Sequence, residues 1–400
     1  MKFKTILVFL ASVLYGFSQD SKNLALTPPM GWNSWNTFAL EINEKLIKET
    51  ADAMVESGLL KAGYNYLILD DGWSAMERDE NGKLYGDPAK FPSGMKALGD
   101  YIHSKGLKFG IYNCAGDKTC GGYPGSRGHE FMDARTYAEW GVDYLKYDWC
   151  NTKKLNAEGA YTTMSNALVA TGRPMVFSIC EWGHNEPWKW GKDIGHLWRV
   201  TGDIDLKWDG VIKHESWTTF GIWTIINMHE GIRQYSGPGH WNDFDMLEVG
   251  NGLTDAENRS HFAMWAMLAS PLILGNDLRS MDKKTLEILA NKEIIGINQD
   301  SLGIQGFRLS NENKIEIWVK PLTKNEWAIS FVNKNEEPYK VDFNWSAQNI
   351  SDEINKLNID FQHKNFKIID VFKNKQIGDT HKSLKATLDV HDVLMIKLIE

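Results

Sequence analysis

The sequence is poor in cysteine and has no excess of positive charge. Four cysteines stand among 400 residues, at positions 114, 120, 150 and 180, and none shows the C-x-x-C spacing of a zinc site. Lys and Arg total 44 against 52 Asp and Glu, so the net charge is −8. Nucleic acids and anionic membranes attract basic surfaces, so neither is an expected partner. The single histidines form no metal-binding pattern, and we expect no metal.

The sequence also lacks a hydrophobic run long enough to cross a membrane. The most apolar stretch, residues 5–17, follows two lysines and precedes a polar segment. It is too short to span a bilayer, but its order is typical of a secretory signal peptide. We therefore expect residues 1–19 to be a signal peptide and the protein to be exported, either periplasmic or secreted. In an exported protein the cysteines can pair, and four cysteines allow three pairings.

Cofactor-binding fingerprints are absent as well. No G-x-G-x-x-G motif follows an early strand, and no phosphate-binding loop is present, so no cofactor is expected. Tryptophan, in contrast, is abundant, with 17 residues. Most of these rings are expected in the core, but an excess of Trp also suits a protein that stacks against the apolar faces of sugar rings.

Residues 25–303 repeat one pattern, in which a helix-like stretch ends in Gly, a short apolar strand follows, and a polar or aromatic cluster comes next. The Gly residues at 63, 106, 141 and 172 are placed to end helices in the left-handed conformation. The expected strands are 29–35, 64–69, 107–112, 142–147, 175–178, 197–200, 240–241 and 271–274. Eight alternating βα units of this length predict an α/β fold, a (β/α)8 TIM barrel. An open doubly wound sheet is the alternative.

The composition changes after Gly303. Residues 304–400 contain short runs rich in β-branched and aromatic residues, separated by Asn-rich turns. The expected strands include 307–309, 315–319, 327–332, 339–343 and 393–398. This pattern predicts a small C-terminal antiparallel β-sandwich domain with Lys-rich polar faces and no catalytic cluster.

Polar and aromatic residues follow the expected barrel strands. They are Trp35, Asp70, Asp71, Tyr112, Lys146, Asp148, Glu181, Trp182, Arg199, Asp203 and Asp245. A barrel brings the C-terminal ends of its strands to one rim, which is where barrel enzymes do chemistry. Carboxylates accept hydrogen bonds from hydroxyl groups, and aromatic rings cover apolar sugar faces. The cluster therefore suits a neutral polyol, and two carboxylates flanking a glycosidic bond are enough to hydrolyse it.

Several motifs resemble those of one enzyme family. They are Pro-Pro-Met-Gly-Trp-Asn-Ser-Trp (28–35), Leu-Asp-Asp-Gly-Trp (69–73), Cys-Gly-Gly-Tyr-Pro-Gly-Ser (120–126), Leu-Lys-Tyr-Asp-Trp-Cys (145–150), Cys-Glu-Trp-Gly (180–183) and Trp-Asn-Asp-Phe-Asp-Met-Leu (241–247). Together they resemble glycoside hydrolase family 27, the α-galactosidases and α-N-acetylgalactosaminidases. The resemblance runs in order through residues 25–305 and extends to the trailing β-domain, as in a secreted bacterial member of the family.

The resemblance implies a retaining mechanism with Asp148 as the nucleophile and Asp203 as the general acid/base. It also implies a disulfide between Cys120 and Cys150 beside the sugar. The residues it implies for substrate binding are Trp35, Asp70, Asp71, Tyr112, Cys120, Lys146, Cys150, Glu181, Trp182, Arg199 and Asp245.

The resemblance also bears on the substrate. Bulky Glu181 and Trp182 would fill the space beside the 2-hydroxyl that N-acetylgalactosaminidases leave open, which favours α-galactose. β-L-Arabinopyranosidases of the family carry Glu in place of Asp71, so Asp71 points to galactose too. These two activities remain the enzyme alternatives. A non-catalytic sugar-binding protein is the third, although it would be expected to lack Asp148 or Asp203.

Two features depart from the family pattern. Phe244 stands where the family usually has Pro, so the loop near Asp245 is expected to differ. Cys180 matches a half-cystine of some members, but no Cys stands near Gly195 to pair with it. The pairing of Cys114 and Cys180 is therefore left open.

Overall fold

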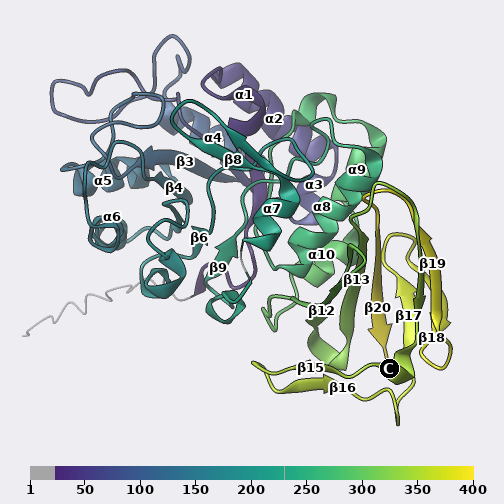
Figure 1. The fold of residues 1–400 in the computed structure, drawn as a ribbon. Helices are drawn as coiled ribbons and strands as arrows, with labels where there is room; N and C mark the ends of the chain where they lie inside the picture. Colours follow the sequence, from purple (N-terminus) through teal and green to yellow (C-terminus); the bar gives the residue numbers. More distant parts are fainter. Residues whose placement is uncertain (1–22, 229) are drawn as a thin grey trace, which may run out of the picture.

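The computed structural model describes residues 23–228 and 230–400, and Figure 1 shows them as a barrel followed by a β-domain. The expected signal peptide, residues 1–19, lies outside the described residues. The barrel strands are β1 (Met30–Asn33), β2 (Tyr66–Leu69), β3 (Lys108–Cys114), β4 (Tyr144–Asp148), β5 (Val176–Cys180), β6 (Leu197–Arg199), β9 (Trp241–Asp243) and β10 (Leu272–Leu274). They pair in parallel in the order β10-β1-β2-β3-β4-β5-β6-β9, which confirms the predicted α/β barrel.

The ring closes just beyond the end of β9. Leu247 forms a parallel bridge with Leu274 of β10, and its N–H donates to the carbonyl of Ile273 at 2.8 Å. The segment that follows β9 therefore joins the last strand. As a result, the residues between β9 and Leu247, including Asp245, belong to the wall of the barrel.

Each barrel strand is buried on both faces because its side chains alternate between two apolar environments. In β4, Leu145 and Tyr147 belong to the large core between sheet and helices. Tyr144 belongs to a smaller cluster inside the barrel, together with Tyr66 of β2 and Leu197 of β6. This alternation decides which side chains at the strand ends face the barrel axis.

Ten α-helices are found in the described part of the chain. They are α1 (Trp35–Phe38), α2 (Glu44–Glu56), α3 (Leu59–Ala62), α4 (Met95–Ser104), α5 (Glu130–Trp140), α6 (Ala157–Ala170), α7 (Ile222–Asn227), α8 (Asp255–Met267), α9 (Lys283–Leu289) and α10 (Lys292–Asn298). Gly63 and Gly141 end α3 and α5 at φ values of 116° and 81°, as the sequence predicts. Among the described residues, no helix is both apolar and long enough to cross a membrane.

The C-terminal domain is antiparallel, as predicted. Its strands are β11 (Phe307–Glu312), β12 (Ile315–Pro321), β13 (Trp327–Asn333), β14 (Tyr339–Phe343), β15 (Ile350–Asp352), β16 (Leu357–Ile359), β17 (Lys367–Asp370), β18 (Lys375–Asp379), β19 (Leu384–Leu388) and β20 (Val393–Ile399). The main sheet has the order β11-β12-β13-β20-β17-β18, and β14–β19 and β15–β16 form two-stranded ribbons. A domain boundary between residues 303 and 304 stays a prediction, and it falls between α10 and β11.

Helix α8 joins the two domains. It packs against β12, β13 and β20, and residues of these strands share one buried core with the barrel helices. Arg259 of α8 forms an ion pair with Asp392 at 2.8 Å, and Ser260 Oγ donates to the carbonyl of His391 at 2.6 Å. The sheet therefore lies against the side of the barrel, as Figure 1 shows.

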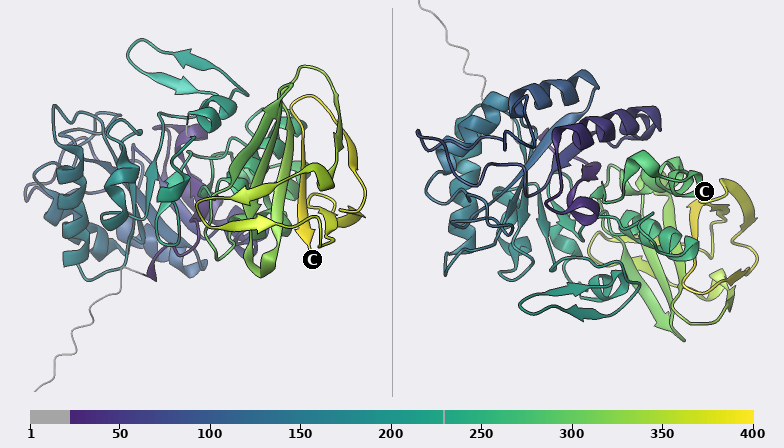
Figure 2. Two further views of the ribbon diagram at one scale, coloured as in Figure 1. Left: turned by 60° about the horizontal axis from the view of Figure 1, so that its bottom comes forward. Right: turned by 90° about the horizontal axis from the view of Figure 1, so that it is seen from above.

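A β-hairpin that the sequence analysis did not predict follows β6. Its strands, β7 (Val211–Lys213) and β8 (Thr218–Phe220), pair antiparallel. In the left view of Figure 2, this teal hairpin projects away from the body of the barrel.

Candidate active site

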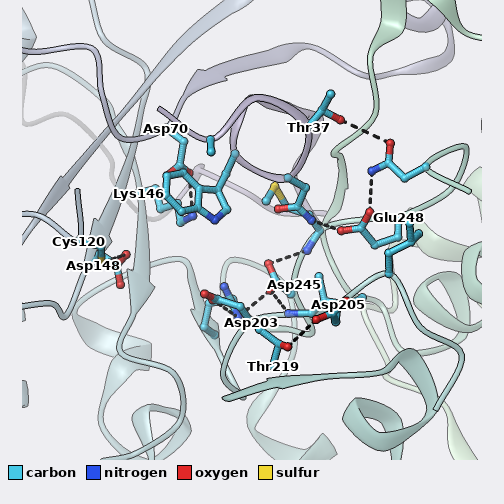
Figure 3. Close-up of a pocket in the computed structure, with 18 of the residues that line it drawn as sticks. Thr37, Asp70, Cys120, Lys146, Asp148, Asp203, Asp205, Thr219, Asp245 and Glu248 are labelled. Atoms are coloured by element: carbon cyan, nitrogen blue, oxygen red, sulfur yellow. Dashed lines mark hydrogen bonds and ion pairs between the residues drawn. The ribbon is translucent and has the colours of Figure 1, made fainter. Parts of the chain in front are cut away.

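A cavity of about 530 Å³ opens at the C-terminal ends of the barrel strands. Nine of the predicted residues line it: Trp35, Asp70, Tyr112, Cys120, Lys146, Asp148, Arg199, Asp203 and Asp245. They come from segments far apart in the sequence, and Figure 3 shows several of them around one space. The geometry thus gathers most of the predicted cluster at one rim.

Strand alternation explains which predicted residues reach the cavity. Tyr144, Lys146 and Asp148 occupy every second position of β4, so the two polar residues continue the row that begins inside the barrel. Tyr112 on β3 lines the same cavity. In β4, the inward-facing side chains are thus charged only near the C-terminal end of the strand, where the cavity opens.

Asp71, Cys150, Glu181 and Trp182 are predicted site residues that do not line the cavity. Asp71 accepts hydrogen bonds from the N–H groups of Gly72 and Gly121 at 2.8 and 2.7 Å. It therefore fixes the loop that carries Cys120.

Glu181 follows β5 and is fully buried, where it accepts hydrogen bonds from the backbone and the side chain of Asn185, both at 2.7 Å. Burial raises the pKa of Glu181 to about 7. Trp182 has a φ of 62°, and its ring meets that of His184 edge-on. Their expected position beside a sugar 2-hydroxyl stays a prediction.

Asp148 is held by donors on both carboxylate oxygens. Tyr112 Oη donates to Oδ2 and the N–H of Trp149 donates to Oδ1, each at 2.8 Å. Burial raises the pKa of Asp148 to about 6, Lys146 opposes that rise, and the negative charge of Asp203 adds to it. The carboxylate is therefore fixed in position but poorly solvated, which favours a nucleophile that loses its charge in the reaction.

Lys146 and Asp70 form a largely buried ion pair. Lys146 Nζ lies 2.7 Å from Asp70 Oδ2, which also accepts a hydrogen bond from Asn33 Nδ2 at 2.8 Å. The surrounding carboxylates raise the pKa of Lys146 despite its burial, so the amine stays protonated. The pair offers a donor and an acceptor side by side, which matches neighbouring hydroxyl groups on a sugar.

On the opposite wall of the cavity, Arg199 connects Asp203 and Asp245. Its Nη2 lies 2.7 Å from Asp245 Oδ2 and 3.1 Å from Asp203 Oδ1. Asp245 is buried and has a φ of 79°, and it also accepts a hydrogen bond from the N–H of Ile204 at 2.8 Å. The Asp203 side chain is 35% exposed, far more than Arg199 at 3%. Asp203 therefore faces the open part of the cavity, where a leaving group or water can reach it.

The departure at Phe244 has a structural reason. Its ring is fully buried and meets Trp265 edge-on, and its N–H donates to Ser270 Oγ at 3.2 Å. Proline has no N–H and could not make that bond. The loop around Asp245 is thus fixed here by a hydrogen bond.

The predicted disulfide between Cys120 and Cys150 is confirmed, and it closes a separation of 30 residues. Cys120 Sγ lies 3.3 Å from Asp148 Oδ2. Cys114 and Cys180 are free and buried. Among the described residues, Cys120, Cys150 and Asp148 also form a cluster of possible metal ligands, but the disulfide removes both thiolates that a metal would need.

The sequence analysis missed the outer part of the cavity. Its lining also includes Asn36, Thr37, Ala39, Ile204, Asp205, Leu206, His214, Trp217, Thr219, Met246, Glu248 and Asn251. Glu248 accepts hydrogen bonds from the side chains of Asn36 and Asn251, so it ties two loops together. A local signal for the hairpin does exist, because β-branched residues flank the polar turn from His214 to Ser216.

The chain matches two family models. One, described as α-galactosidase A, covers residues 27–300, and the other, the C-terminal β-sandwich domain of α-galactosidase, covers residues 312–398. The chain belongs to the α-galactosidase family, glycoside hydrolase family 27. The resemblance seen in the sequence is thereby confirmed.

Individual members of the family align over nearly the whole chain. The α-galactosidase A of Cellvibrio japonicus is 51% identical over 95% of this chain and 94% of its own length. The α-galactosidase 2 of Arabidopsis thaliana is 45% identical over 98% and 96%. The crystal structure of α-galactosidase I from Mortierella vinacea superposes with a TM-score of 0.89 at 38% identity, covering 95% of this chain and 98% of that one. Both domains of this family 27 chain therefore have counterparts in its relatives.

Proposed function

We propose that the protein is a retaining α-galactosidase that removes terminal α-D-galactose from oligosaccharides, polysaccharides or glycoconjugates. The observation that carries the proposal is the pair Asp148 and Asp203 in one cavity, in a chain 51% identical to an α-galactosidase. One carboxylate is buried and held by donors, and the other is open to the leaving-group side. Two carboxyl groups in such different surroundings suit a double displacement.

In the proposed reaction, Asp148 attacks the anomeric carbon and forms a covalent glycosyl ester. Asp203 donates its proton to the departing glycosidic oxygen in the same step. Water then enters, Asp203 takes its proton, and the water oxygen attacks the anomeric carbon from the face that the leaving group vacated, which breaks the ester bond and releases the Asp148 carboxylate. Two inversions release α-galactose.

The remaining lining residues are proposed to bind the galactose. Lys146 and Asp70 offer their paired donor and acceptor to hydroxyl groups, and Arg199 lies beside Asp203 for the 2-hydroxyl. Trp35 covers an apolar face of the ring. Asp71 and Glu181 hold neighbouring loops in place, and their contacts with the sugar, like that of Trp182, stay predictions.

Product stereochemistry and a substrate panel test this function. NMR during hydrolysis of 4-nitrophenyl α-galactoside should show α-galactose first, before mutarotation. Initial β-galactose would exclude the retaining mechanism. The kcat/KM for this substrate should exceed those for the α-N-acetylgalactosaminide and the β-L-arabinopyranoside. A higher value for either would replace the proposed activity by that one, and binding without turnover of any would leave a sugar-binding protein.

We propose, in addition, that the protein is exported and that residues 1–19 are removed. The disulfide supports an oxidising compartment, since such bonds persist outside the reducing cytosol. N-terminal sequencing of the mature protein checks this, and a protein that retains Met1 in the cytosol would contradict it.

A further inference from the structure

The cavity continues beyond the groups proposed to bind galactose. Those groups lie deep, with Asp70 and Asp148 at 2% and 6% exposure. The outer end is lined by Leu206, His214, Trp217 and Thr219, which no proposed galactose contact uses. A second sugar unit attached to the galactose would have to pass through this outer part.

The hairpin is attached directly to the segment that carries Asp203. The N–H of Phe220 in β8 donates to the carbonyl of Asp203 at 2.9 Å, and the N–H of Asp205 donates to the carbonyl of Phe220 at 2.8 Å. Thr219 Oγ1 donates to Asp205 Oδ2 at 2.6 Å, and a ring nitrogen of His214 lies 3.1 Å from Thr219 Oγ1. The hairpin is thus fixed on the leaving-group side of the site, where Figure 3 shows Thr219 and Asp205 next to Asp203.

Trp217 presents a flat ring at this position. It is 53% exposed, which is unusual for so large an apolar side chain. Its ring stacks on His214, with centroids 4.0 Å apart and planes 16° from parallel. Stacking fixes the orientation of the indole before any ligand arrives, and a preoriented aromatic face suits the C–H face of a pyranose ring.

We infer that Trp217, supported by His214, forms a binding subsite for the neutral sugar ring attached to the galactose. The inference rests on the proposed function and names the kind of leaving group: a pyranose unit of an oligosaccharide or polysaccharide. Asp205 places a carboxylate within the same wall, which gives an acceptor for hydroxyl groups and disfavours an anionic leaving group.

Two substrates separate this subsite from the galactose site. α-Galactosyl fluoride has no sugar ring beyond the galactose, whereas raffinose has two. For Trp217→Ala, the ratio of kcat/KM for raffinose to that for the fluoride should fall about tenfold, equivalent to about 1.4 kcal/mol of stacking. Trp217→Phe, which keeps a planar ring, should restore most of the ratio.

Val211→Ala is the matched control, since Val211 lies on the same hairpin, is 52% exposed and does not line the cavity. Its ratio should equal that of the wild type. An unchanged ratio in Trp217→Ala would overturn the subsite, even if kcat/KM fell equally for both substrates. A wild-type protein that does not hydrolyse the fluoride would instead overturn the proposed function.

Discussion

At the residue scale, the site contains buried charges whose loss of hydration is only partly offset by hydrogen bonds and ion pairs. Asp148 receives two hydrogen bonds, yet burial still raises its pKa to about 6. In the unfolded chain an Asp ionises near pH 3.9. The ionised carboxylate therefore destabilises the folded protein. Its proposed role in catalysis, rather than stability, explains why it is kept there.

Asp148→Asn should abolish turnover, by about 10³-fold or more, and should stabilise the protein at neutral pH. A raised folded pKa means that the wild type loses stability as pH rises from about 4 to about 6, and the full cost is present above that range. The variant lacks this cost, so its free energy of unfolding should be higher by about 3 kcal/mol at pH 7.5 and nearly equal at pH 4.

Urea unfolding at the two pH values measures this difference. Asp100→Asn serves as the control, because its side chain is 59% exposed and a surface change should stay within about 0.5 kcal/mol. A gain for Asp148→Asn that is the same at both pH values would contradict the role of the buried charge.

Asp203→Ala tests the acid/base assignment. The kcat/KM for substrates with poor leaving groups should fall by about 10² to 10⁴-fold, because no group donates a proton to the departing oxygen. Hydrolysis of α-galactosyl fluoride should be affected less, since fluoride leaves without a proton. Added azide should restore turnover and yield α-galactosyl azide, detected by NMR. Failure of azide to give that product would argue against Asp203 as the base.

At the scale of elements, loops after three consecutive strands are tied together beside Asp148. The disulfide joins the loop after β3 to the end of β4, and Asp71 after β2 binds the N–H of Gly121 next to Cys120. Parallel strands bring these loops to one rim but do not fix their positions. The covalent and hydrogen-bonded links supply that order.

Replacing both Cys120 and Cys150 by Ser should lower the free energy of unfolding by about 3 kcal/mol, as expected for closing a loop of this length in the chain-entropy model. It should also lower kcat/KM, because the contact between Cys120 and Asp148 becomes mobile. Chemical unfolding with and without dithiothreitol checks the expected change in stability. Reductant should bring the wild type down to the level of the variant and leave the variant unchanged, and a wild type insensitive to reductant would contradict the expectation.

At the scale of the whole molecule, the two domains share one core. The face of β12 that meets the barrel carries Glu316, Trp318 and Lys320, all of them buried. Lys320 Nζ donates to the carbonyl of Ala266 in α8 at 2.9 Å, and burial lowers its pKa to about 7. The interface therefore contains an amine that folding forces toward its neutral form.

Lys320→Met should stabilise the protein near neutral pH. A folded pKa below the unfolded value of about 10.4 means that the wild type pays a growing cost as pH falls from about 10 to about 7. Met fills similar space without a charge, at the loss of one hydrogen bond worth about 1 kcal/mol. The gain should be a few kcal/mol at pH 7 and should vanish by pH 10, as measured by urea unfolding at both values. A gain independent of pH would contradict it.

The sequence by itself determined which eight segments form the barrel strands, with their ends within two residues of the observed ones. Apolar runs bounded by glycine predict buried strands wherever both faces are covered, and the carboxylates that follow them predict the rim. The positions of Asp148, Asp203 and Lys146 were found in this way, because strand ends are local features. The pairing of Cys120 with Cys150 came from family resemblance, since four cysteines alone leave three possibilities.

Only the tertiary structure decided which of the rim residues reach the cavity. Asp71 and Glu181 follow their strands one position away from the row that faces the axis, and a shift of one residue turns a side chain to the other face. The hairpin carries a local strand signal, but only the structure shows that it lies beside Asp203 and that Trp217 lines the cavity. The buried Lys320 was missed because a Lys in a strand is expected to face solvent, and the distant segments that bury it leave no pattern in the local sequence.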